Sequence, residues 1–229
     1  MSEFFRNRDV VFYIILVVSI ILTRTPLVGK YFRIVNTMIH ESGHALVALI
    51  TSAQVLQINL FTDTSGSAVT KSNNWFSKFF TSLAGYPSSA LAAMLFFYLI
   101  KQHQSIYIIW GLGALAVINL IFFVRNTYGI FWLVTFIIIS GGIIYLNDDF
   151  SLFSISVFFS FIVLTDALIS AIHLFIICFK TPDKSGDAKN LSTLTFIPAL
   201  IWSLLFLAFN TWIIYYTIIN YFPLHFVKG

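Results

Sequence analysis

Long apolar segments alternate with short polar ones along most of this chain. Seven apolar segments are long enough to form helices, and the polar connections between most of them are short. They cover residues 10–28, 34–53, 79–100, 105–124, 128–146, 152–179 and 194–221. The pattern predicts an all-α polytopic membrane protein with about seven transmembrane helices, built as a single domain over residues 1–229.

Residues 54–71, between the second and third segments, have a different pattern. Apolar and polar side chains alternate over residues 55–61, and residues 62–67 are rich in turn formers. Residues 68–70 can then return as a second strand, so a short β-hairpin is predicted here, with an ordinary connecting loop as the alternative. Because an isolated hairpin is marginally stable in water, we expect it to lie against the helices or the membrane interface.

Composition supports a membrane location. Hydrophobic residues make up 59% of the chain and charged residues only 10%, whereas a soluble domain has about 25% charged residues. The net charge of +4 lies in the short connections, so it reflects topology and gives no reason to expect a nucleic-acid partner. The single cysteine, Cys178, excludes an intramolecular disulfide.

The distribution of basic residues predicts the orientation. The first apolar segment has no small-residue cleavage site, so we interpret it as a membrane segment and not as a signal peptide. With the N-terminus in the cytoplasm, more Lys and Arg residues fall on the inner side than on the outer side. The chain is therefore expected to be an integral membrane protein in a lipid bilayer, with a cytoplasmic N-terminus.

The second segment contains the most informative motif, His40-Glu41-Ser42-Gly43-His44. On a helix, His40 and His44 share one face, so both imidazoles can reach one metal ion. Glu41 lies close enough to act on a water molecule bound to that metal. The metal-free alternative is two core histidines beside a glutamate, but three polar groups in an apolar helix would then need other partners. Zn²⁺ is the expected metal, although imidazole and carboxylate ligands also suit other divalent ions.

A catalytic zinc usually has three protein ligands, so a third is needed. Asp166 is the first choice, because it lies near the middle of its apolar segment, as the histidines do in theirs, and a lone buried carboxylate is costly. It could instead bond a Ser or Thr or line a water cavity. Asp187, in the polar loop of residues 180–190, is the alternative third ligand if that loop folds back, and is otherwise a solvated or helix-capping acid.

The motif and its surroundings resemble those of a known family. His40-Glu41-Ser42-Gly43-His44-Ala45 in a membrane helix resembles the H-E-x-G-H of site-2 proteases, which are intramembrane zinc metalloproteases. The hairpin and Ala84-Gly85-Tyr86-Pro87 follow in the same order. Arg125-Asn126-Thr127-Tyr128-Gly129, and Gly186-Asp187-Ala188 before Trp202, are similar to the compact bacterial M-fifty-B-like branch.

The resemblance implies that His40 and His44 bind zinc, that Glu41 is the general base, and that the membrane is a bacterial cell membrane. Site-2 proteases carry the third ligand in a motif of Asn, Pro and Asp-Gly, and this chain has no Asp-Gly. The third ligand is therefore predicted from its depth in the membrane alone.

We expect a zinc metallopeptidase that hydrolyses peptide bonds in or near the membrane. Its substrate would be a transmembrane or membrane-proximal protein segment. The alternatives are a non-proteolytic membrane metal-binding or transport-like protein that keeps the fold, and a structural membrane partner without bound metal. A requirement for Glu41 separates the first two, and bound zinc separates both from the third.

Overall fold

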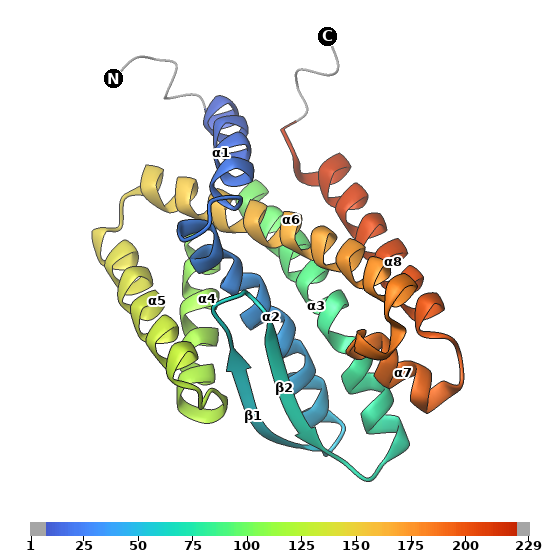
Figure 1. The fold of residues 1–229 in the computed structure, drawn as a ribbon. Coiled ribbons are helices and arrows are strands. Elements are labelled where there is room, and N and C mark those ends of the chain that lie inside the picture. The colour runs from blue at the N-terminus through green and yellow to red at the C-terminus, as the bar shows by residue number, and fades with distance from the viewer. Residues whose placement is uncertain (1–7, 224–229) are drawn as a thin grey trace.

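The computed structural model describes residues 8–223 of the chain. Helices dominate this part of the molecule, with one two-stranded sheet (Figure 1). In order, the elements are α1 Arg8–Leu22, α2 Val28–Ile50, β1 Gln54–Leu60, β2 Gly66–Lys71, α3 Trp75–Lys101, α4 Ile106–Ile118, the π-helix η2 Asn119–Phe123, α5 Thr127–Leu146, α6 Asp149–Lys180, the 3₁₀-helix η3 Pro182–Lys184, α7 Asp187–Thr195 and α8 Ala199–Tyr221. The predicted all-α fold with a short β-hairpin is confirmed.

Five helices of the described part are long and apolar enough to cross a membrane. They are α3, α4 with η2, α5, α6 and α8. The other two predicted segments also form helices, but α1 has only 15 residues and α2 carries the polar motif. Many large apolar side chains on these helices are exposed, as expected where lipid replaces water as the surrounding medium. The protein is a membrane protein, and its orientation stays a prediction.

The seventh predicted segment is not one continuous helix. Its first residues belong to the short helix α7, which ends at Thr195. Phe196 then adopts a left-handed backbone conformation, and Pro198 immediately precedes the first residue of α8. Since proline cannot donate the backbone hydrogen bond that a continuing helix needs, the chain turns here. As a result α7 lies beside α3 and α8 (Figure 1).

The hairpin lies along α2, between α2 and the connection from α4 to α5. β1 and β2 pair antiparallel, and Ile58 and Leu60 of β1 are completely buried in the main hydrophobic core. At the turn, the Thr37 hydroxyl of α2 donates to the Thr64 carbonyl over 2.7 Å. Packing against the helices therefore stabilises a two-stranded hairpin that would be only marginally stable alone.

The outer edge of β1 is already occupied by the connection between α4 and α5. Ile58 forms a parallel bridge with Val124. The Leu60 N–H donates to Asn126 Oδ1 over 3.1 Å, and Asn126 Nδ2 donates back to the Leu60 carbonyl over 2.6 Å. Asn126 thus imitates a neighbouring strand at the end of β1, which leaves β2 as the open edge of the sheet.

Candidate metal centre and active site

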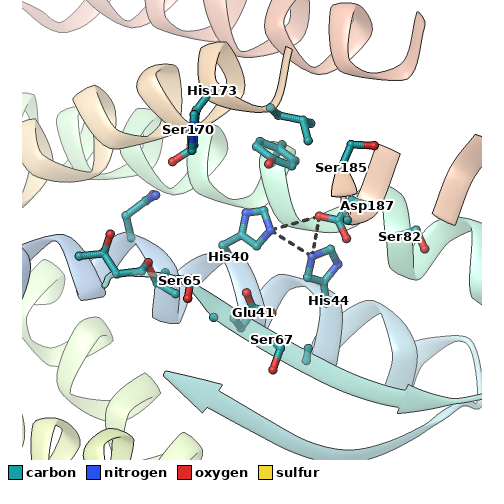
Figure 2. Close-up of a pocket in the computed structure, with 18 of the residues that line it drawn as sticks. His40, Glu41, His44, Ser65, Ser67, Ser82, Ser170, His173, Ser185 and Asp187 are labelled. Atoms are coloured by element: carbon teal, nitrogen blue, oxygen red, sulfur yellow. Dashed lines mark hydrogen bonds and ion pairs between the residues drawn. The ribbon is translucent and has the colours of Figure 1, made fainter. Parts of the chain in front are cut away.

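His40 and His44 lie one helical turn apart on α2 and direct their rings to the same point (Figure 2). Their Nε2 atoms are 3.1 Å apart. His44 Nδ1 lies 2.6 Å from the Thr81 carbonyl oxygen of α3. Because a carbonyl can only accept a hydrogen bond, Nδ1 carries the proton and the Nε2 lone pair stays available for a metal.

The third group at this point is the Asp187 carboxylate. Its Oδ2 lies 3.3 Å from His40 Nε2 and 3.1 Å from His44 Nε2. Asp187 is the first residue of α7 and follows Gly186, which has a positive φ of 48°. Ala188 and Leu191 hold α7 in place, because both are completely buried in a second apolar cluster that includes Trp202. Burial alone would raise the pKa of Asp187, but the adjacent imidazoles outweigh this effect and hold it below its usual value.

Glu41 belongs to the same site but contacts the hairpin. Glu41 is only 6% exposed and lies beside the start of β2 (Figure 2). Gly66 at the start of β2 passes so close that a Cβ atom there would lie 2.7 Å from Glu41 Oε1. The carboxylate is therefore beside the three donors without being one of them. Such a position suits a proton acceptor for a water molecule at the centre.

The three donors fit a zinc ion. Within the described residues, His40, His44 and Asp187 form a group whose ligand atoms all lie within 4.8 Å of one another. Tetrahedral zinc with bonds of 2.0–2.2 Å separates its ligand atoms by about 3.3–3.6 Å. The three distances of 3.1–3.3 Å lie at or within a few tenths of an ångström of that range, so small movements of the side chains would accommodate the ion. Two imidazoles and one carboxylate are also a donor set typical of catalytic zinc sites, in which the fourth position stays open.

One family model matches the chain. The model describes Peptidase M50B-like proteins, and it covers residues 13–217. The chain belongs to this family. No curated protein and no solved structure matches it.

Membership in the M50B-like family, which belongs to the site-2 proteases, makes this membrane protein an intramembrane metallopeptidase with a protein substrate. The similarity to site-2 proteases that the motif indicated is thereby confirmed. The match spans four of the five long apolar helices completely, most of α8, and both motif histidines. The donor group and the family therefore point to the same location for the chemistry.

Asp166, the first choice for the third ligand, is not in the donor group of this M50B-like peptidase. Its carboxylate accepts from Arg33 Nε through both oxygens, each over 3.0 Å. Equal depth in two segments predicted that α6 would present Asp166 to the histidines. However, Arg33 lies on the same face of α2 about two turns earlier, and it satisfies the buried charge instead. The alternative, Asp187, is the carboxylate that the structure brings to the imidazoles.

A polar cavity of about 770 Å³ surrounds the site. Its lining includes the three donors, Glu41, β2 and the Arg33–Asp166 pair. His173 of α6 also lines it, outside the donor group. Hydrolysis consumes water, and a polar cavity next to the donors can hold the water that an apolar helix bundle would otherwise exclude.

Gly85 of α3 is a site residue whose role the sequence did not reveal. A Cβ atom at this position would collide with the Nε2 atoms of both His40 and His44. The space in front of the two lone pairs is therefore open only because residue 85 has no side chain. In the sequence, Gly85 stood out only as part of Ala84-Gly85-Tyr86-Pro87 in the family resemblance, and no local pattern connects it with the histidines.

Proposed function

We propose that this M50B-like protein is a zinc-dependent intramembrane protease in which His40, His44 and Asp187 hold the metal. The observation that carries the proposal is the convergence of three donor atoms at mutual distances of 3.1–3.3 Å. The Thr81 carbonyl supports it further by fixing the tautomer of His44. Asp187 replaces Asp166 as the proposed third ligand.

Glu41 is the proposed general base. Bound zinc would polarise a water molecule and the scissile carbonyl. Glu41 would take the proton of that water and then deliver it to the leaving amine. Glu41 lies beside β2, close to the three proposed metal ligands but not among them. From there it could reach both the water molecule and the leaving amine. A non-proteolytic metal-binding protein would need the three donors but would have no use for Glu41, and no observation favours that alternative.

The open edge of β2 is the proposed guide for the substrate. In an antiparallel pair of strands, two residues that lie opposite each other either both hydrogen-bond across the pair or both direct their N–H and C=O groups to the outer edges. Leu60 directs its N–H and C=O outward to Asn126, so its partner Gly66 directs its own to the other edge. The same holds two residues on, for Ile58 and Ala68. Gly66 and Ala68 line the cavity, and the Ala68 N–H interacts with the Glu41 carboxylate, so an extended substrate that adds here as a third strand would lie directly beside the proposed base.

Glu41→Gln tests the proposed chemistry. The purified variant should keep its zinc and its thermal stability, because Glu41 is not a ligand. Cleavage of transmembrane peptides, followed by mass spectrometry, should fall at least about 100-fold because the amide cannot accept the proton. Asp63→Asn, at the exposed turn of the hairpin, is the matched control and should leave cleavage unchanged. Full turnover by Glu41→Gln would rule out the proposed base.

A further inference from the structure

Arg33 and Asp166 place a partly used guanidinium group in the cavity of the proposed active site. The pair joins α2 to α6, and both residues line the cavity. The Asp166 side chain is 5% exposed and the Arg33 side chain 28% exposed. The carboxylate is therefore enclosed, while the Arg33 side chain, which also lines the cavity, stays partly accessible.

Only one nitrogen of Arg33 makes the pair. Nε donates to both carboxylate oxygens, and neither terminal nitrogen has a hydrogen-bond partner among residues 8–223. These two nitrogens carry four N–H donors in a planar fork, which is the arrangement that binds a carboxylate with two parallel hydrogen bonds. Nε alone is sufficient to join the two helices, so the two terminal nitrogens are left for another group.

A second unsatisfied group lies next to Arg33. Asn36, one turn further along α2, also lines the cavity and is 5% exposed. Its Oδ1 atom is buried and has no hydrogen-bond partner in the described part of the chain. A buried amide oxygen without a partner costs about 1–3 kcal/mol, and a ligand N–H would remove that cost. Arg33 and Asn36 together thus offer donors for a carboxylate and an acceptor for a neighbouring amide.

The spacing relates this pair to the proposed metal centre. Arg33 precedes His40 by seven residues, so it lies on the same face of α2 and about 10 Å away along the helix axis. An extended peptide covers that distance in about three residues. We propose that Arg33, held by Asp166 and assisted by Asn36, binds a carboxylate of the substrate peptide about three residues from the scissile bond. The proposal rests on the proposed function of this cavity.

The carboxylate has two possible sources, an acidic side chain or the free C-terminus of the substrate. Three short fluorescent peptides of one apolar sequence separate them: one with Glu and an amidated C-terminus, one with Gln and an amidated C-terminus, and one with Gln and a free C-terminus. Their affinities are measured by fluorescence anisotropy on full-length protein in detergent. The Glu41→Gln background prevents turnover during the measurement.

One of the two carboxylate peptides should bind at least about tenfold more tightly than the neutral peptide, because a charge-assisted hydrogen bond contributes about 1.5–3 kcal/mol. Arg33→Lys keeps the positive charge and can still pair with Asp166, but it lacks the fork. In Arg33→Lys, the affinities for the carboxylate peptide and the neutral peptide should differ by no more than about twofold. Zinc content and the affinity for the neutral peptide should stay unchanged.

Lys184→Gln is the matched control, since it removes a positive charge from the lining of the same cavity but leaves Arg33 intact. The preference should survive that change. Equal binding of all three peptides, or a preference that Arg33→Lys retains, would overturn the proposal. Because binding is measured without turnover, this outcome is distinct from a failure of the proposed protease chemistry, which would appear as wild-type protein that holds zinc and cleaves nothing.

Discussion

Asp187 Oδ2 lies 3.3 Å from His40 Nε2, although 147 residues separate the two in the sequence. The carboxylate comes from the first turn of a short helix, and the imidazole comes from the middle of a long one. The proposed metal centre therefore depends on how α7 packs beside α3 and α8. Changes to the ligands, to the packing around them and to the substrate edge should have separable effects.

Replacing Asp187 with Ala should weaken zinc binding more than 100-fold, because losing a direct ligand costs more than the roughly 10–100-fold that an outer partner contributes. Zinc per protein, measured by mass spectrometry after dialysis against a weak chelator, checks this. Asp183→Ala removes an exposed acid of the same loop that pairs with Lys189, so it is the control and should keep its zinc. Retention of zinc by Asp187→Ala would exclude Asp187 as a ligand.

Asp166→Asn should keep zinc but reduce stability. The substitution removes the charge that holds Arg33, and breaking a fully buried pair costs about 3–5 kcal/mol. Arg33 is 28% exposed, so solvent can compensate it in part and a loss of about 1–2 kcal/mol is expected. Thermal unfolding in detergent measures the loss of stability, and the zinc content of the same sample shows whether the metal is retained. Loss of zinc at unchanged stability would instead restore Asp166 as the ligand.

Gly85→Ala should abolish zinc binding, because the added methyl group would occupy the space in front of both Nε2 atoms. Gly111→Ala is the matched control. A Cβ atom there meets nothing within 4 Å, and alanine is favoured over glycine in a helix by about 1 kcal/mol. The control should therefore keep its zinc and be as stable as the wild type or more so. Normal zinc content in Gly85→Ala would show that the donors meet elsewhere.

Ala68→Pro should impair cleavage without releasing zinc. The Ala68 N–H points away from β1 and towards the Glu41 carboxylate, so proline removes no hydrogen bond between the strands but does remove a backbone donor from the proposed base and from the open edge. Cleavage of a transmembrane peptide should fall at least about tenfold, since Glu41 loses this hydrogen bond and the strand can no longer offer the donor to a substrate. Ala68→Ser keeps the N–H and is the control. An unchanged rate in Ala68→Pro would mean that neither the base nor the substrate depends on this edge of the hairpin.

The sequence determined the helices, the hairpin and two of the three donors, because each follows from a local pattern. Apolar length predicted the membrane helices, two-residue alternation predicted residues 54–71, and the spacing of His40 and His44 placed both on one helix face. The break at Pro198 was also visible in the sequence, although the predicted segment ran through it. These features depend on residues a few positions apart.

Only the tertiary structure decided which carboxylate meets the histidines. Depth in a segment does not specify which way a helix face points, so Asp166 and Asp187 could not be separated by sequence alone. The burial of Ala188 and Leu191 beside Trp202 brings Asp187 to the imidazoles, while Arg33 pairs with Asp166. The roles of Gly85 and of the open edge of β2 were hidden for the same reason. Each depends on contacts between elements that are distant along the chain, and packing alone determines those contacts.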